Sequence, residues 1–343
     1  MNYLIFRTDR IGDFLITSPL IKAIKRNDTK SEIYIVASDK NKNFIKDYNL
    51  VDEIFVLKSK KIVDRFKLLL ELRKRKYDYI IIADKKNRSI IFSFFLKSKN
   101  KIFNVSKKIQ KKLLQILYKN VFLDNDDFKD QTMKYVLEKN CTSLNFNLTN
   151  EDFHYLNPNQ FKNEYLHNDI LELEKNNFLL LHYDEKWEIQ NYSKSYKKAL
   201  ELTDIDINFK DFLDFLSQLS KKTSKKIIIT TGTIQTKIIE ELKNSSNKIN
   251  EFVYEINLNN TRAYLLTKEN FLSVSHIISK SSLFISCHGA FIHIASNYKI
   301  KILDIIEKNK ITHYGKITYN MKNYKSLYRN NFKTLSKDII KCS

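Results

Sequence analysis

Short apolar segments alternate with longer amphipathic segments over the first third of the chain. The apolar segments have the length and composition of strands and cover residues 3–6, 32–37, 53–57, 79–83 and 101–105. This alternation is typical of βαβ units. Residues 79–83 are apolar at every position, as expected for a parallel strand that is buried on both faces. The pattern predicts a doubly wound α/β domain.

The same rhythm returns in the second half of the chain. Strands are expected at residues 178–183, 226–232, 251–256, 282–286 and 301–305. Helices are expected between and after them, at residues 209–222, 235–243, 271–280 and 290–297. The periodicity fades between residues 124 and 177, apart from one helix near 131–141, so a domain boundary is expected there.

These segments divide the chain into an N-terminal domain of residues 1–170 and a second Rossmann-like domain of residues 175–320. Residues 321–343 are expected to form a C-terminal helical segment that packs back toward the N-terminal domain. Open α/β domains bind ligands at the carboxyl ends of their strands. An active site that uses both domains is therefore expected.

The first candidate site follows the first strand. Arg7, Arg10, Gly12 and Asp13 lie within seven residues, at the point where the strand gives way to a helix. The dipole of that helix would keep Asp13 ionised, so that it could accept a proton from a substrate hydroxyl. The alternative is that Asp13 is only a favourable N-terminal helix residue and Arg10 a solvated neighbour.

The second candidate site lies between residues 286 and 296. His288, Gly289, Ala290 and His293 stand where a strand leads into a helix. Small residues let a phosphate approach the backbone, and histidines can donate hydrogen bonds to anionic oxygens. The alternative is that His293 faces the core, with Cys287 as a small buried hydrophobe.

Two further turns follow strands of the second domain. His182 ends one strand, Lys186 follows it closely and could counter a diphosphate, and Trp187 could line the cleft. Thr231 and Gly232 end the next strand and could face a ligand. The alternative for the first turn is an ordinary surface loop with a buried tryptophan, and the alternative for the second is a plain βα connection.

Several chemistries are disfavoured. The sequence has no P-loop, GxSxG or GxGxxG motif, which disfavours NTP hydrolysis, serine esterase chemistry and dinucleotide redox chemistry. Asp124 and Asp126, like Asp204 and Asp206, resemble metal-binding pairs, but neither pair follows a core strand clearly. No metal or other cofactor is expected. The three cysteines are widely spaced and are expected to be reduced.

Composition and charge indicate which macromolecules or surfaces the protein is expected to bind. The 343 residues carry a formal charge of +21, and a positive surface attracts polyanions and the anionic inner leaflet of a membrane. The lysines are scattered and the composition is typical of an AT-rich genome, so specific nucleic-acid binding is not expected. The N-terminus has no signal-peptide pattern, which predicts a cytoplasmic protein. The positive charge favours peripheral association with the cytoplasmic face of the inner membrane.

One segment stands apart from these sites. Residues 88–97 form a short aromatic and aliphatic stretch between cations. A buried helix is the preferred interpretation, and insertion into a membrane interface is the alternative.

The chain resembles the heptosyltransferases, which are glycosyltransferase family 9. Residues 4–25 follow the opening pattern of that family closely, including Gly12, Asp13 and Pro19, and residues 282–296 follow a second family segment more weakly. The resemblance implies a GT-B fold with two facing Rossmann-like domains. It implies that the N-terminal half binds a glycan acceptor and the C-terminal half a nucleotide-sugar.

The resemblance also implies residue roles. Asp13 matches the family's catalytic base in an inverting, metal-independent transfer. Arg7, Arg10 and Gly12 would bind the acceptor, a lipid-linked or lipopolysaccharide-type glycan.

The donor would be bound by residues of the second half, namely His182, Lys186, Thr231, Gly232, His288, Gly289, Ala290 and His293. His288 occupies the place of a family aspartate, so a sugar other than heptose is an alternative donor. A basic nucleic-acid-binding protein and a non-catalytic homologue are the rivals from other classes.

Overall fold

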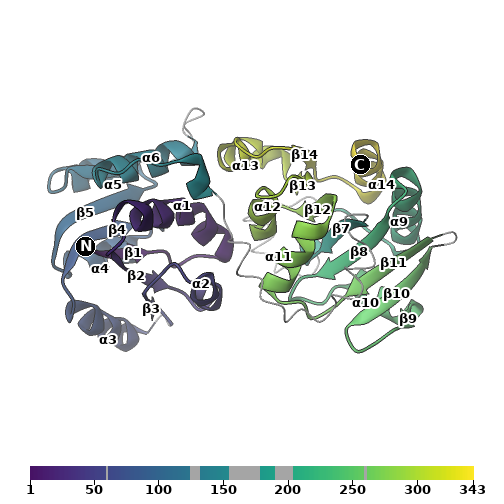
Figure 1. Cartoon of the computed structure of the whole chain (residues 1–343), viewed down its shortest axis with the longest axis horizontal. Coiled ribbons are helices and arrows are strands. Elements are labelled where there is room, and N and C mark those ends of the chain that lie inside the picture. Colours follow the sequence, from purple (N-terminus) through teal and green to yellow (C-terminus); the bar gives the residue numbers. More distant parts are fainter. Residues whose placement is uncertain (59–60, 124–131, 154–177, 190–203, 259–260) are drawn as a thin grey trace. The chain divides into compact units, whose positions relative to one another are not determined.

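The computed structural model describes residues 1–58, 61–123, 132–153, 178–189, 204–258 and 261–343 (Figure 1). The acidic stretch at 124–127 therefore lies outside the described residues. The chain divides into two compact units. Unit 1 comprises Met1–Gln160 with Gly315–Tyr319, and unit 2 comprises Phe161–Tyr314 with Asn320–Ser343.

Unit 1 is built on a six-stranded sheet with the order β3-β2-β1-β4-β5-β6. Its strands are β1 (Asn2–Phe6), β2 (Glu32–Ala37), β3 (Glu53–Val56), β4 (Tyr77–Ile82), β5 (Ser98–Val105) and β6 (Asn120–Leu123). All the pairings are parallel. The order reverses between β1 and β4, so the carboxyl ends of these two strands form a switch point, where such sheets bind ligands.

Helices cover both faces of this sheet. The helices of unit 1 are α1 (Ile11–Asn27), α2 (Lys42–Tyr48), α3 (Ile62–Arg73), α4 (Asn87–Phe94), α5 (Lys108–Gln115) and α6 (Met133–Ser143). Leu68 of α3, Ile90 of α4 and Leu114 of α5 belong to one buried cluster with Phe6 and Phe103 of the sheet. These three helices therefore share a face, while α1 packs with α2 and α6.

Unit 2 is built on an eight-stranded sheet with the order β14-β13-β12-β7-β8-β11-β10-β9. Its strands are β7 (Phe178–Tyr183), β8 (Lys226–Thr231), β9 (Asn247–Lys248), β10 (Val253–Leu258), β11 (Thr261–Leu266), β12 (Leu283–Cys287), β13 (Lys301–Ile306) and β14 (Tyr324–Tyr328). The described helices are α9 (Phe209–Thr223), α10 (Lys237–Ser245), α11 (Phe271–Lys280), α12 (Ala290–Ala295) and α14 (Phe332–Cys342). The helix α13 (Ile311–Thr318) is divided between the two units, since Gly315–Tyr319 belongs to unit 1.

The edge of this second sheet departs from the expected parallel arrangement. On the side of β8 away from β7, the parallel neighbour is β11, a strand that the sequence pattern did not single out. The expected strand at 251–256 is β10, which pairs antiparallel with β11. Only two residues separate β10 from β11, too few for a parallel crossover, and this spacing was the available signal for a hairpin.

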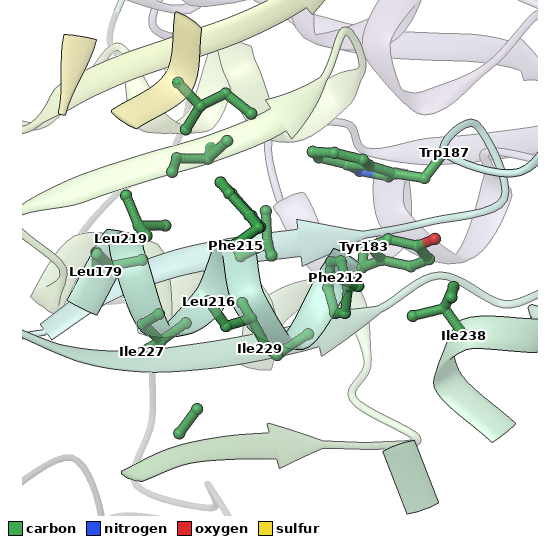
Figure 2. Close-up of a cluster of buried hydrophobic side chains, with 14 of the residues drawn as sticks. Leu179, Tyr183, Trp187, Phe212, Phe215, Leu216, Leu219, Ile227, Ile229 and Ile238 are labelled. Atoms are coloured by element: carbon green, nitrogen blue, oxygen red, sulfur yellow. The ribbon is translucent and has the colours of Figure 1, made fainter. Parts of the chain in front are cut away.

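One buried cluster of unit 2 lies between a face of this sheet and α9, with α14 beside it (Figure 2). Trp187 is fully buried and stacks on Tyr183 with ring centroids 5.2 Å apart. Phe212 meets the same Tyr183 ring edge-on at 5.2 Å. Trp187 is thus a core residue, as the alternative interpretation of its loop held, and does not line a cleft.

The C-terminal segment differs from its expected form. It begins with β14, so it is not wholly helical, and its helix α14 packs against α9 and β14. Phe332, Leu335 and Ile339 of α14 are buried in the core of unit 2. The amphipathic pattern of α14 therefore marks a helix that packs into the core of unit 2.

Candidate functional site

Asp13 occupies the first turn of α1, immediately after the carboxyl end of β1. Its Oδ2 accepts a hydrogen bond from the backbone N–H of Arg10 at 3.1 Å, and its Oδ1 lies 3.7 Å from a guanidinium nitrogen of Arg7. These contacts orient the carboxylate, yet 41% of the side chain remains exposed. Asp13 is therefore a held but accessible carboxylate, as a general base must be.

Arg7, which is expected to bind the acceptor, is a buried side chain that contacts the first turn of α1. It is only 4% exposed, and its Nε donates to the backbone oxygen of Asp13 at 2.8 Å. A second guanidinium nitrogen donates to the backbone oxygen of Ala83, just after β4. Arg7 thus links the first turn of α1 to the end of β4, and this contact fixes the backbone of Asp13. Arg10 is exposed and Gly12 is half-buried.

Asp9 is a second carboxylate beside Arg7, 3.4 Å from its Nε. Burial raises the pKa of Asp9, against the opposing effect of the Arg7 cation. Its side chain is 21% exposed, about half as much as that of Asp13. Asp13 is therefore the more accessible of the two carboxylates at this turn.

The structure adds a basic group that the sequence analysis did not assign to this site. Lys86 Nζ donates to the backbone oxygen of Thr8 at 3.0 Å, and Arg88 donates to Thr8 Oγ1 at 2.8 Å. Thr8 in turn donates to the buried carboxylate of Asp84 at 2.6 Å. β1 and β4 are adjacent in the sheet, which brings the residues after both strands together. The signal in the sequence was the charged run that follows the buried strand.

In unit 2, Lys186 lies at the carboxyl edge of the sheet, after β7. Its Nζ donates to Asp184 Oδ2 at 2.8 Å, and its side chain is 30% exposed. The same Nζ lies against Gly289, where an added Cβ would come within 2.9 Å of it. Burial opposes the charge, but the Asp184 carboxylate outweighs burial and raises the pKa of Lys186. The expected cation and the expected glycine turn are therefore adjacent.

Gly232 and Thr231 lie at the end of β8, beside the loop that carries Lys186. A Cβ on Gly232 would meet Asp184 Cβ at 2.9 Å and Asp184 Cα at 3.2 Å. The close approach of two loops thus requires glycine here. Thr231 is half-buried and lies in register with Tyr183. Gly232 thus allows the end of β8 to pack closely against the loop that carries Lys186.

His288 is oriented by a buried carboxylate. Its Nδ1 lies 2.6 Å from Asp304 Oδ2, and the same oxygen accepts from the Tyr324 hydroxyl at 2.8 Å. Asp304 is fully buried, and the Tyr314 ring packs on the imidazole with centroids 3.9 Å apart. Because Asp304 engages Nδ1, Nε2 is the nitrogen left for a ligand. Asp304, Tyr314 and Tyr324 were not predicted, since they lie on later elements of the chain.

The other two candidate histidines are buried and electrically neutral near pH 7. His182 is 4% exposed, lies 3.0 Å from Thr230 Oγ1 and packs against Phe291. Burial lowers the pKa of His182 to about 4, against the opposing effect of Asp184. Burial, with a smaller contribution from His288, lowers the pKa of His293 to about 3. Neither can supply positive charge to a diphosphate, so the core alternative for His293 fits the structure.

A buried arginine, Arg329, contacts Cys287 at the end of β12. Arg329, just after β14, is 3.2 Å from Glu307 and donates to Cys287 Sγ at 3.5 Å. Burial raises the pKa of the Cys287 thiol to about 12, so it stays protonated. These contacts hold together the ends of β12, β13 and β14, and Cys287 behaves as the small buried residue of the alternative interpretation.

Within the part of the chain that the structure describes, no group of three or more histidine, cysteine, aspartate or glutamate side chains is placed to hold a metal ion. No helix in the described part of the chain is long and apolar enough to cross a membrane.

Comparison with solved structures defines the class of fold. The chain matches E. coli heptosyltransferase WaaC with ADP-2-deoxy-2-fluoro heptose with a TM-score of 0.67 and 12% identity, over 100% of both chains. It matches E. coli ADP-heptose lps heptosyltransferase II with a TM-score of 0.63 and 11% identity, over 100% of this chain and 97% of that one. The chain therefore has the GT-B fold, as its resemblance to the heptosyltransferases predicted.

Sequence comparison points in the same direction. A stretch of 102 residues is 28% identical to lipopolysaccharide heptosyltransferase 1 of Campylobacter coli and covers 29% of this chain. The match spans about 30% of the length of that relative. No protein-family model matches the chain.

Proposed function

We propose that the protein is a glycosyltransferase that moves a sugar from a nucleotide-sugar to a lipopolysaccharide-type glycan. The observation that carries the proposal is the accessible Asp13 carboxylate, held by Arg7 and the Arg10 amide at the carboxyl end of β1. The heptosyltransferase fold and the sequence match to a lipopolysaccharide heptosyltransferase support it. ADP-heptose is the first donor to test, because two of the matched proteins are named or solved with it or its analogue.

In the proposed reaction the acceptor hydroxyl is bound by unit 1. Asp13 accepts its proton while the hydroxyl oxygen forms a bond to the anomeric carbon of the donor. The bond from that carbon to the nucleotide diphosphate breaks on the opposite side, so the anomeric configuration inverts. Arg10, Lys86 and Arg88 place positive charge near this turn, which suits an acceptor that carries phosphates.

Unit 2 would bind the donor and stabilise the departing diphosphate. Lys186 supplies a fixed positive charge, and His288 supplies an oriented imidazole. Such preorganised groups stabilise charge that develops as the bond breaks. We propose that they do so without a metal ion. His182 and His293 would shape the pocket from the core and not contact the diphosphate as cations.

The acceptor also suggests a location. A lipopolysaccharide-type acceptor is anchored in a membrane, and a net charge of +21 favours an anionic membrane surface. We therefore place the reaction at the cytoplasmic face of the inner membrane, with the protein bound peripherally.

The test is transfer from a panel of ADP-, GDP-, UDP-, dTDP- and CMP-sugars to lipopolysaccharide-type acceptor, with EDTA present throughout. The proposal expects turnover with one donor class, unchanged by EDTA, and an inverted product linkage. Turnover only with a donor other than ADP-heptose would retain the reaction and reassign the sugar. Absence of transfer from every donor, combined with no stabilisation of the fold by any of them, would reject the proposal.

A further inference from the structure

We propose that the outer surface of α3, α4 and α5 in unit 1 is a docking face for an anionic lipid bilayer. This docking face is defined by the exposed apolar side chains of those three helices. It gives a physical basis to the membrane location in the proposed function, but its evidence is independent of the sugar-transfer chemistry.

The helix α5 presents its apolar side to solvent. Ile109, Leu113, Ile116 and Leu117 recur at helical spacing along α5 and the residues after it, and they are 62–77% exposed. Leu114 is the side chain of α5 that is buried in the core of unit 1. A helix that packs only against its own sheet would turn such a stripe inward. The stripe on α5 therefore needs another apolar surface.

The neighbouring helix α4 extends the same surface. Ile91, Phe94 and Phe95 are 46–58% exposed, although residues 88–97 were expected to form a buried helix. Phe94 stacks on Tyr118, which follows α5, with ring centroids 6.2 Å apart. The exposed aromatic side of α4 thus adjoins the end of α5.

The helix α3 carries a third stripe on the same side of the sheet. Ile62, Phe66 and Leu70 are spaced four residues apart and are 46–81% exposed. Leu68 of α3 belongs to the buried cluster that also holds Ile90 of α4 and Leu114 of α5. Because all three helices pack inward on one cluster, their exposed stripes face outward from the same face of the sheet.

The charge around the docking face favours an anionic membrane as its binding partner. The 39 residues from Lys85 to Leu123, which include α4 and α5, contain eleven lysines or arginines and no aspartate or glutamate. Lys107, Lys108 and Lys112 are exposed beside the apolar stripe of α5. Apolar side chains flanked by cations match the two layers of an anionic membrane surface, acyl chains beneath and negative headgroups above.

Vesicle sedimentation tests the proposal with the full chain. One set of vesicles contains equal parts of phosphatidylglycerol and phosphatidylethanolamine, and the other contains phosphatidylcholine alone. The protein is expected to sediment with the anionic set and to remain in solution with the neutral set. The double variant Ile109→Glu with Leu113→Glu is expected to bind the anionic vesicles about tenfold more weakly or worse.

Two further variants show whether the loss of binding is specific to the apolar residues of the docking face and whether it depends on charge. Ile234→Glu with Ile249→Glu replaces two exposed apolar residues of unit 2, which are 44% and 51% exposed, and should bind like the parent. Lys108→Glu with Lys112→Glu should weaken binding to anionic vesicles by a similar factor. Equal binding by the parent and the Ile109 and Leu113 variant would overturn the proposal. A parent dimer in light scattering that this variant abolishes, without vesicle binding, would assign the face to a second copy instead.

Transfer to a water-soluble, lipid-free acceptor separates this inference from the proposed function. The Ile109 and Leu113 variant should transfer sugar to that acceptor at the parental rate, because these residues lie outside the site. Vesicle binding without transfer by the parent would retain the docking face and reject the proposed reaction. Sugar transfer without vesicle binding would retain the proposed reaction and reject the docking face.

Discussion

The ammonium of Lys186 lies directly over Gly289, so close that a Cβ on Gly289 would come within 2.9 Å of it. The pair joins the loop after β7 to the turn after β12, which are adjacent strands in the sheet of unit 2. The absence of a side chain at residue 289 is thus what lets the cation reach this position.

Gly289→Ala is expected to weaken donor binding by displacing that ammonium. A charge-assisted hydrogen bond contributes about 1.5–3 kcal/mol, so donor affinity should fall by roughly one to two orders of magnitude. Lys186→Met should produce a similar loss, and the two changes together should cost little more than either alone. Calorimetric titration with the nucleotide-sugar that supports transfer measures all three.

The control for Lys186 is Lys301→Met, which removes the same charge from the amino end of β13, a strand that β12 separates from β7. Lys301 begins β13 and is exposed. Its replacement should leave donor affinity unchanged. Equal losses from Lys301→Met and Lys186→Met would mean that net charge, and not the position of Lys186, governs binding.

A second prediction compares two glycines in opposite surroundings. Gly232→Ala forces a Cβ against Asp184 and should lower the free energy of unfolding by about 1–3 kcal/mol. Gly315, in α13, has nothing within 4 Å of an added Cβ, so Gly315→Ala should raise stability by about 0.5–1 kcal/mol. Urea unfolding of both variants is the measurement, and a stabilised Gly232→Ala variant would contradict the described packing.

The buried histidines predict loss of stability in acid. The pKa of His293 is about 3 in the folded protein, below the value of about 6.5 for an unfolded histidine. Stability from such a group is fully present above the unfolded pKa and is lost as the pH falls toward the folded pKa. Between pH 7 and pH 5, His293 alone should cost about 2 kcal/mol of unfolding free energy.

The variant His293→Gln isolates this contribution. Its stability should fall less between pH 7 and pH 5 than that of the parent, by about 2 kcal/mol, whatever its absolute stability. Urea unfolding at both pH values provides the comparison. The same decline in parent and variant would show that His293 is not buried in its neutral form.

The sequence predicted much of the fold because its strands have a strong local signal. The apolar segments at 32–37 and 178–183 correspond to β2 and β7 residue for residue. The hairpin of β10 and β11 was not predicted, because β11 is only partly buried and begins with two polar residues, Thr261 and Arg262, which weaken its apolar signal. The C-terminal helix was recognised, but its packing depends on α9, about a hundred residues earlier, which no local pattern encodes.

Site residues could be predicted from the sequence only where a charged side chain lies in the turn that follows a strand. Asp13 and Lys186 each follow a strand directly, so their positions could be inferred from spacing. The position of Asp304 could not be inferred, because a carboxylate within a buried strand gains its role only from His288, which follows the adjacent strand β12. Burial also decides whether a histidine is charged, and the sequence could not distinguish the oriented His288 from the neutral His293.

The most direct test of the proposed reaction is the turnover of Asp13→Asn. The amide has nearly the same shape but cannot accept the acceptor proton, so turnover should fall by about two to four orders of magnitude while donor affinity stays parental. Asp211→Asn, an exposed aspartate in the first turn of α9, is the matched control and should retain full activity. Parental turnover by Asp13→Asn would contradict the assignment of Asp13 as the base and with it the proposed mechanism.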